Sequence, residues 1–140
     1  MQQAAPRLLL LLEPCTCLLQ VFLNRYLKAV KVGECDQTTE KLCEYLCELT
    51  LQEYAFIKYR PSEVAAAAVW LALHTMRLPT WSPLLHDTSG YPSEELHNCV
   101  SEMFAVFRKA ESNNLQAVRE KYAHAKFLCV STLSPPESFA

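Results

Sequence analysis

The side chains most able to carry chemistry in this chain are its thiols. Cys43 and Cys47 are four positions apart, which places them on one face of a helix, and Cys15 and Cys17 are two positions apart. Either pair could start a zinc site, but a tetrahedral site needs four ligands at defined spacings. The other cysteines and the four histidines supply no matching pair. Because cysteine also packs well as a small buried hydrophobe, we predict that these thiols lie in the core and that the chain uses no metal or cofactor.

A short turn offers the residue types of a nucleophilic triad. His86, Asp87 and Ser89 stand within four positions of one another. Catalytic triads are instead assembled from residues that the fold brings together beside an oxyanion hole, and a run this short is more typical of local backbone hydrogen bonding. His74 has no nucleophile that the sequence can place beside it, so we interpret it as a partly buried, hydrogen-bonded histidine. We assign no catalytic residue and predict that the chain is not an enzyme.

The charged residues point to helix ends rather than to a phosphate or nucleic-acid site. Two glycines, far apart, cannot form a glycine-rich phosphate loop. The pairs Glu34 with Asp36 and Glu94 with Glu95 suit the positive ends of helix dipoles. We interpret the basic residues near the C-terminus as a solvated face, with contact to a phosphate-bearing partner as the alternative. A net charge of −2 argues against binding to nucleic acid or to an anionic membrane.

The elements that must position these groups are organised around one apolar stretch. Residues 64–73 carry no charge and no hydroxyl, and they are mostly Ala and Leu, which are strong helix formers. Pro61 suits the first turn of a helix that starts there. Ten residues at about 1.5 Å each span only half a bilayer, so this helix belongs in the middle of a soluble protein, covered by other helices.

Four further helices and a short connector are expected around this central helix. Apolar residues recur at steps of three and four, and start or stop signals mark the ends. The predicted helices begin at Pro14, Asp36 (as N-cap), Ser93 and Leu115, and the connector is capped by Ser82. We expect Gly33 to end the first helix. No strand pattern occurs, so the predicted class is all-α.

The chain reads as one domain with two short flanks. A length of 140 residues and a hydrophobic content of 51% fit a single globular unit. The leucines at 8–12 follow Arg7 but are too few for a signal peptide, and Glu13-Pro14 ends the run. We therefore predict a lead-in over 1–13, a helical domain over 14–126 and an extended tail over 127–140. Seven cysteines without an export signal favour a reducing, intracellular compartment.

Five sets of residues occur in an order that resembles a known family. They are residues 46–54; residues 59–68 with 71–73; Trp81-Ser82-Pro83 with Ser89-Gly90-Tyr91; residues 117–122 with Lys126-Phe127; and Val130-Ser131 with Pro135-Pro136-Glu137. In this order they resemble the second helical repeat of A/B-type mitotic cyclins, and the Pro-Pro-Glu ending is closer to the A type. The resemblance covers about residues 14–139.

This resemblance implies a five-helix cyclin-like domain with its third helix at the centre. It also implies a regulatory subunit that binds a cyclin-dependent protein kinase and acts in cell-cycle control, mitosis and cell division, in the nucleus and the cytoplasm. Cyclins activate the kinase by holding its αC helix inward. The first cyclin repeat supplies most kinase contacts, and residues 1–13 are too short to replace it. We therefore assign no kinase-binding residue and expect weak or absent kinase binding without that repeat.

Two other functions remain open from the sequence. One is a helical adaptor that binds another protein without activating a kinase, and the other is a transcription factor bound to nucleic acid, which the charge disfavours. A second repeat on its own would also expose surface that normally packs on the first. We expect some of Leu19, Phe22, Leu23 and the leucines at 8–12 to form an exposed apolar patch that allows self-association.

Overall fold

The computed structural model describes the backbone of residues 4–31, 36–79 and 81–138, and the side chains of these residues except 4–16 and 31. Within these ranges the α-helices are α1 (Ala4–Lys31), α2 (Gln37–Leu51), α3 (Pro61–Thr75), α4 (Pro83–Ser89), α5 (Ser93–Lys109) and α6 (Ala117–Tyr122). Short 3₁₀ turns follow α2, α5 and α6: η1 (Tyr54–Lys58), η2 (Ala110–Ser112), η3 (Ala125–Phe127) and η4 (Val130–Thr132). These ranges contain no strand, and α4 is the expected connector between the five main helices. The all-α prediction is confirmed.

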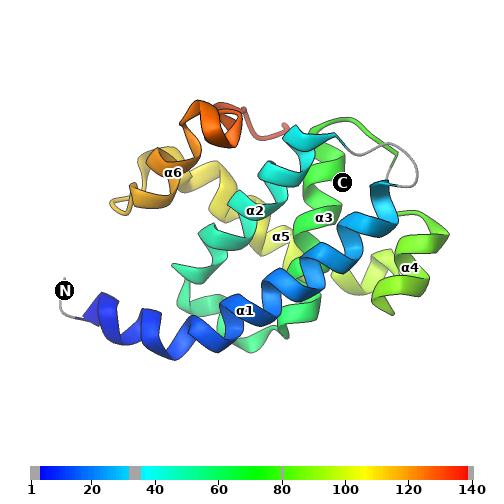
Figure 1. The fold of residues 1–140 in the computed structure, drawn as a ribbon, viewed down its shortest axis with the longest axis horizontal. Helices are drawn as coiled ribbons and strands as arrows, with labels where there is room; N and C mark the ends of the chain where they lie inside the picture. Colours follow the sequence, from blue (N-terminus) through cyan, green and yellow to red (C-terminus); the bar gives the residue numbers. More distant parts are fainter. Residues whose placement is uncertain (1–3, 32–35, 80, 139–140) are drawn as a thin grey trace.

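Helix α3 lies at the centre of the bundle. It contacts α1, α2 and α5, which lie around it in Figure 1. The side chains of residues 64–69 and 71–73 are buried, and those of the four consecutive alanines are fully so. Small alanine side chains allow three helices to approach the same axis closely. Trp70 is half-buried, and its Nε1 donates a hydrogen bond to Ser93 Oγ at 3.0 Å, which joins α3 to α5. The predicted central helix is confirmed.

Helix α1 begins earlier than the sequence suggested. It starts at Ala4 and passes through Glu13 and Pro14 without a break, so the predicted start at Pro14 is wrong. A proline inside a helix removes one hydrogen bond and costs about 3 kcal/mol, but leucine is a strong helix former and five leucines precede this point. Gly33, the expected end of this helix, lies outside the described residues.

A hydrogen-bonded chain holds α1 against the start of α3. The Tyr26 hydroxyl donates to the Ser62 carbonyl at 3.2 Å, and the Ser62 hydroxyl lies 2.8 Å from the Tyr91 hydroxyl. Tyr26 is 1% exposed, and this burial raises the pKa of its hydroxyl to about 12. The phenol therefore stays neutral and remains a donor at physiological pH.

Helix α2 begins at the residue expected to cap it. Asp36 Oδ1 accepts hydrogen bonds from Thr39 N at 2.9 Å and from Thr39 Oγ1 at 2.8 Å. These bonds favour the charged carboxylate and hold the pKa of Asp36 below its usual value. Glu34, the other member of the predicted acidic pair, lies outside the described residues.

The Asp36 cap predicts a pH-dependent difference in stability. A carboxylate whose pKa is lowered by folding stabilises the native state above its unfolded pKa of about 3.9, and this stabilisation disappears as the pH falls through the lower folded value. Asp36→Ala is expected to lower the free energy of unfolding by about 1 kcal/mol at pH 7 and by much less at pH 2. Urea titrations at both pH values measure this. Asp36→Asn is the control, because Asn caps well without titrating. An equal loss for Asp36→Ala at both pH values would contradict the assignment.

The connector α4 is capped by Ser82, as its sequence predicts, and by Gly90 at its other end. Ser82 Oγ accepts from Leu85 N at 3.2 Å at the start of the helix. Gly90 ends it in the left-handed region, with φ of 78°, where a residue without a Cβ is not strained. The indole of Trp81 donates to the Tyr91 carbonyl at 2.8 Å, which fixes the connector beside the start of α5.

The tail is less extended than predicted. Two 3₁₀ turns, η3 and η4, interrupt residues 125–132, and Val130 is fully buried. Ser131 Oγ donates to the Arg119 carbonyl at 2.7 Å, which holds η4 to α6. From Leu133 to Ser138 the chain has no regular helix and crosses from the α6 side of the bundle toward the end of α3 (Figure 1). The extended prediction is confirmed only for this last part.

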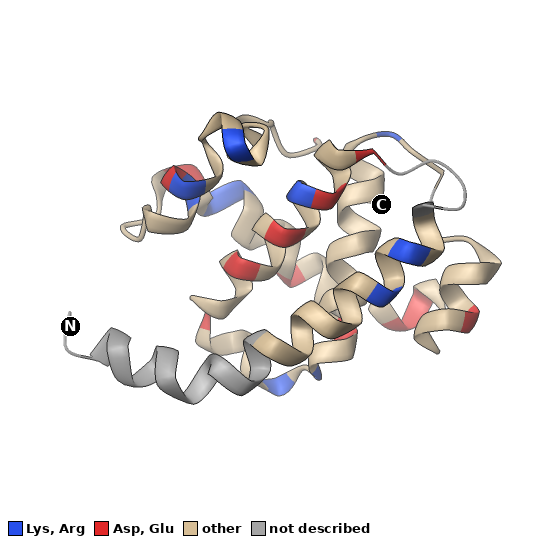
Figure 2. Cartoon of the chain, viewed as in Figure 1, with Lys and Arg blue, Asp and Glu red and all other residues tan. Residues whose placement is uncertain are grey.

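Charge is distributed as the central position of α3 requires. Beyond its first turn the ribbon of α3 carries no Lys, Arg, Asp or Glu, whereas α2, α5 and α6 carry both signs (Figure 2). In the part of the chain that the structure describes, no helix is long and apolar enough to span a bilayer.

Candidate protein-interaction surface

Three of the cysteines predicted to pack in the core do so, but the prediction is wrong for Cys17, which is exposed, and Cys129 is only half-buried. The side chains of Cys15 and Cys35 lie outside the described part. Cys43 is fully buried and Cys47 is 5% exposed, both on α2, and Cys99 on α5 is fully buried as well. Burial raises the pKa of the Cys47 thiol to about 12, and the nearby Glu44 and Glu48 add to the effect. Burial also raises the pKa of Cys99. Protonated, buried thiols are inert, so these side chains act as hydrophobes. Among the described residues no group of three or more His, Cys, Asp or Glu could hold a metal ion.

Thiol labelling tests this packing. Cys17 is exposed on α1, and we expect it to react with iodoacetamide in the native protein. Cys43, Cys47 and Cys99 are expected to react at least about a hundredfold more slowly, because their exposure requires unfolding of the core. Peptide mass spectrometry locates the label. Full labelling of all three buried thiols at the rate of Cys17, without denaturant, would show that the core is open.

The serine-containing turn is used for local hydrogen bonding. Ser89 Oγ accepts from Tyr91 N at 3.1 Å, while the exposed side chains of His86 and Asp87 lie on α4. Gly90 N donates to the His86 carbonyl at 2.8 Å, which completes the C-terminal cap of α4. The structure thus places these residues in one turn of helix and its end, as predicted.

His74 is half-buried and hydrogen-bonded, as the sequence indicated. Its ring stacks on Trp70 one turn earlier, with centroids 5.3 Å apart and planes at 18°. Its Nε2 lies 2.8 Å from the Ser138 carbonyl oxygen. His74 therefore connects the end of α3 to the C-terminal segment.

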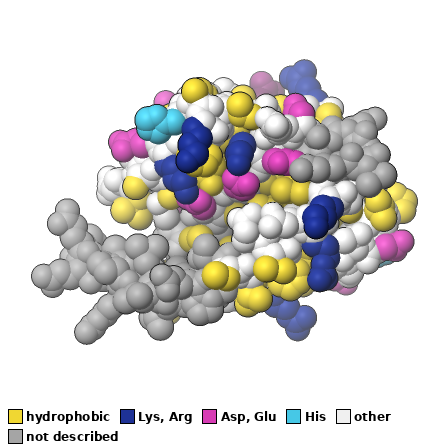
Figure 3. Space-filling view, viewed as in Figure 1, with side chains coloured by type: hydrophobic (Ala, Val, Ile, Leu, Met, Phe, Trp, Pro, Cys, Tyr) yellow, Lys and Arg dark blue, Asp and Glu magenta, His cyan; other side chains and the backbone are white. Residues whose placement is uncertain are grey.

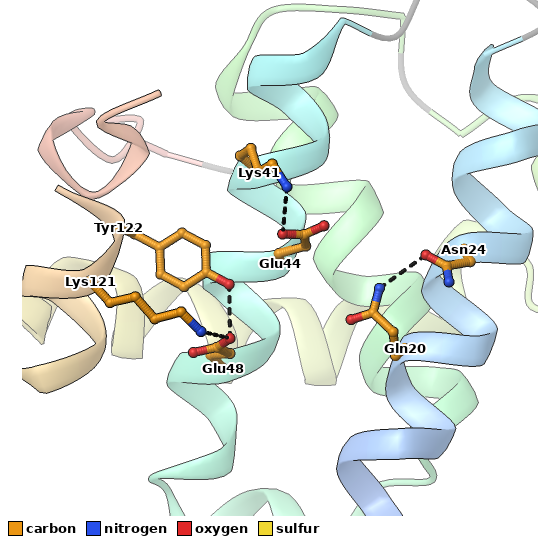
Figure 4. A network of polar contacts seen from close by, with 7 residues as sticks. All are labelled: Gln20, Asn24, Lys41, Glu44, Glu48, Lys121 and Tyr122. Carbon is orange, nitrogen blue, oxygen red and sulfur yellow. Dashed lines mark hydrogen bonds and ion pairs between the residues drawn. The ribbon is translucent and has the colours of Figure 1, made fainter. Parts of the chain in front are cut away.

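Polar side chains on the outer face of α2 join it to α6. Glu48 Oε1 accepts from Lys121 Nζ at 2.7 Å and from the Tyr122 hydroxyl at 2.9 Å (Figure 4). One turn away on α2, Lys41 pairs with Glu44 at 3.3 Å. The basic face predicted for the last helix is thus only partly solvated, because its Lys121 pairs with Glu48 of α2. Exposed pairs of this kind contribute at most about 1 kcal/mol each, so α6 is held mainly by its buried Tyr122.

Helix α1 exposes apolar side chains, but at other positions than expected. Leu18 and Val21 are 48% and 56% exposed, whereas Leu19 and Leu23 are 6% and 1% exposed. The predicted patch is therefore wrong for Leu19 and Leu23, which pack in the core, and Phe22 is half-buried. The side chains at 8–12 lie outside the described part. Figure 3 shows hydrophobic side chains at the surface along this helix.

The seam between α1 and α2 is nearly closed. A cavity of about 40 Å³ remains between the two helices, with Leu19, Leu23, Cys47 and Leu51 among its apolar walls. Gln20 lines the cavity on the α1 side, and its amide donates to Asn24 Oδ1 at 3.0 Å (Figure 4). Pockets for organic ligands are about 300–1,000 Å³, so this seam admits no such ligand.

The described residues thus define an all-α domain built around α3, with polar side chains that bond both within and between its outer elements and with apolar side chains exposed on α1 and elsewhere. Residues 17–136 match the family described as the cyclin C-terminal domain. The chain belongs to the cyclin family.

Relatives in this family are similar over four fifths of the chain. The G2/mitotic-specific cyclin-A of Patella vulgata is 39% identical over 111 residues, which are 79% of this chain and 26% of the relative. The G2/mitotic-specific cyclin-B of Hydra vulgaris is 41% identical over 112 residues, which are 80% of this chain and 30% of the relative. Human cyclin-A1 is 40% identical over 116 residues, which are 82% of this chain and 24% of the relative. The chain therefore spans about a quarter to a third of the length of these relatives.

Proposed function

We propose that this chain is the C-terminal part of a cyclin regulatory subunit that binds a cyclin-dependent protein kinase in cell-cycle control at mitosis. The observation that carries the proposal is the match of residues 17–136 to the cyclin C-terminal domain. Similar proteins named as G2/mitotic-specific cyclins of both A and B types support it. The central helix α3 gives the domain a rigid core from which its surface helices can act.

The proposed role is regulatory and not catalytic. Activation of such a kinase requires its Lys–Glu ion pair and its activation segment to be in place, and a bound protein achieves this by favouring one position of the αC helix. This needs a rigid surface and no reacting group. The local hydrogen bonding of Ser89 and the inert core thiols are consistent with that role.

A binding and activity experiment tests the proposal. The chain is immobilised and offered a purified cyclin-dependent kinase, and both retention and phosphorylation of a peptide substrate are measured. A parallel sample carries the first repeat of a relative joined ahead of Cys17. We expect weak retention by the chain alone, and retention with activation when the first repeat is present. Absence of retention in both samples would contradict the proposal.

A second candidate function is a helical adaptor that binds a protein without activating a kinase. The exposed Leu18 and Val21 on α1 favour it, because an unpaired apolar helix face is a common docking surface. The same experiment separates the two functions. Retention without activation in the sample that includes the first repeat supports the adaptor.

Self-association is proposed through the same two residues. Leu18 and Val21 are three positions apart, so they face the same side of α1 and could pair with a second copy. Sedimentation at rising protein concentration tests this, with a Leu18→Glu variant as comparison. A sedimentation coefficient that does not change with concentration, and is the same for both proteins, would argue against it. For localisation we propose the nucleus and the cytoplasm, which imaging of a fluorescent fusion tests.

A further inference from the structure

Two serines of this chain are followed directly by proline. They are Ser82, before Pro83, and Ser134, before Pro135. A Ser-Pro dipeptide is the minimal recognition element of proline-directed protein kinases, which bind it as an extended segment. Both serines meet the sequence requirement, so any difference in how readily a kinase phosphorylates them must come from the fold.

The structure makes Ser82 a poor substrate. Its hydroxyl is already the N-cap of α4 and accepts from Leu85 N at 3.2 Å. Ser82 itself has extended backbone angles, but Pro83 is the first residue of the helix, so the residues that follow the serine are helical and not extended. Ser82 is also half-buried. Phosphorylation there would require α4 to unwind first.

Ser134 lies in the opposite situation. It is exposed, and it lies in the 133–138 segment, which has no regular helix. Leu133 has extended backbone angles, with φ of −67° and ψ of 136°, and the two prolines after Ser134 favour the same conformation. Both prolines are half-buried and hold the segment on the bundle, whereas Ser134 itself is exposed.

The segment forms one wall of a groove at the end of α3. The groove measures about 750 Å³, and its lining includes His74, Thr75, Arg77 and Leu78 on one side and residues 134–138 on the other. A phosphate group is small beside this volume. Arg77, a cationic residue, and Ser134 therefore line the same groove.

Arg77 is the side chain best suited to receive a phosphate. It is exposed, and it is held in the left-handed region with φ of 57°, with its N–H donating to the His74 carbonyl at 3.1 Å. Within the described ranges no carboxylate forms an ion pair with it. A guanidinium donates two parallel hydrogen bonds to a phosphate, and such bonds are about twice as strong as neutral ones.

Two features of the groove oppose a phosphate. Glu137 lines it with a carboxylate, and the negative end of the α3 dipole points into it. The dipole effect is reduced because the last carbonyls of α3 are hydrogen-bonded, including that of Leu73, which accepts from Leu78 N at 2.9 Å. Glu137 is exposed, so solvent and salt screen its repulsion. Direct charge-assisted hydrogen bonds from Arg77 to a phosphate are stronger than either of these screened effects.

We propose that Ser134 is a phosphorylation site for a proline-directed protein kinase and that Arg77 receives the phosphate, which ties the C-terminal segment to the end of α3. In the transfer, the γ-phosphorus of ATP forms a bond to Ser134 Oγ while its bond to the β–γ bridging oxygen breaks. ADP leaves, and the hydroxyl proton passes to the catalytic base of the kinase. The product carries a charge between about −1.5 and −2 at pH 7.

The site is tested on the full chain with ATP, Mg²⁺ and a purified proline-directed kinase whose activity is verified on a Ser-Pro peptide. Intact mass and peptide sequencing are expected to show one phosphate, on Ser134. The Ser82→Ala variant is expected to accept it equally and the Ser134→Ala variant to accept none. If phosphate is found on Ser82, or if the folded chain accepts no phosphate, Ser134 is not the phosphorylation site proposed here.

The role of Arg77 is tested by amide hydrogen exchange of Ser134, Glu137 and Ser138, which carry the backbone N–H groups of this segment, before and after phosphorylation. Exchange is expected to slow about tenfold in the phosphorylated protein, as one charge-assisted hydrogen bond would produce. The Arg77→Asn variant, whose asparagine tolerates the left-handed backbone, is expected to be phosphorylated without this slowing. Unchanged or faster exchange in the phosphorylated parent protein, or equal slowing in the variant, would overturn the role of Arg77.

Discussion

Ala66→Asp is expected to lower the free energy of unfolding by at least about 3–5 kcal/mol. Ala66 is fully buried on α3, at the point where α1, α2 and α5 surround that helix. A carboxylate at this position would lose its hydration and gain no cationic partner, since the middle of α3 and its buried neighbours are apolar. Small domains are stable by about 5–15 kcal/mol in total, so the variant should lose a large part of its stability. Circular dichroism and urea titration measure the loss.

Ala105→Asp is the matched control for this substitution. Ala105 lies on α5 and is exposed, so the same chemical change costs only the difference in helix propensity, about 0.7 kcal/mol or less. If the two variants had equal stability, Ala66 would not lie in the centre of the fold.

Tyr45→Ala is expected to cost about 3–5 kcal/mol by leaving a cavity. Tyr45 is 1% exposed on α2, and its ring joins three helices. It meets Phe107 of α5 edge-on, with centroids 6.2 Å apart, and Tyr122 of α6 at 5.4 Å. Its removal should therefore loosen α6 in particular, because Tyr122 is the buried residue of that short helix. Thermal unfolding measures the loss, and hydrogen exchange in α6 measures the loosening.

Tyr54→Ala provides the control for the aromatic truncation. Tyr54 opens η1 and is 75% exposed, so its removal should change the free energy of unfolding by no more than about 0.5 kcal/mol. A Tyr45→Ala variant as stable as the Tyr54→Ala variant would mean that the Tyr45 ring does not hold α2, α5 and α6 together.

The central helix and the caps were predictable because their causes are local. An uncharged run from 64 to 73 can lie only in a core, and the structure buries it. Asp36 and Ser82 cap the helices that follow them because a short side-chain oxygen reaches an N–H three positions on. These features depend on a few neighbouring residues and not on the rest of the fold.

The first residue of α1, and the side of this helix that faces the core, could not be predicted from local signals in the same way. Pro14 is a local stop signal, but the helix formers on both sides continue through it. Leu18 and Leu19 are equally apolar, and the periodic pattern cannot say which one faces the core. Packing against α3 decides it: Leu19 aligns with Leu23 and Tyr26 on the buried side and leaves Leu18 in solvent.

The hydrogen bonds between surface residues far apart in the sequence could not be predicted either. Glu48 joins Lys121 and Tyr122 across more than seventy positions, and His74 meets Ser138 across sixty-four. Contacts of this kind follow from how the helices pack, so the groove at the end of α3 becomes visible only in the fold. The 3₁₀ turn that buries Val130 was missed because its three residues are too few for a periodic pattern.

The most direct test of the account is native-state hydrogen exchange along α3. If other helices enclose this helix, the amides of residues 66–73 should be among the slowest to exchange, with a free energy of opening close to that of global unfolding. The amides of α6, a six-residue helix near the edge of the bundle, should exchange much faster. Exchange of residues 66–73 at the rate of α6 would show that the alanine-rich helix is not the core of this cyclin domain.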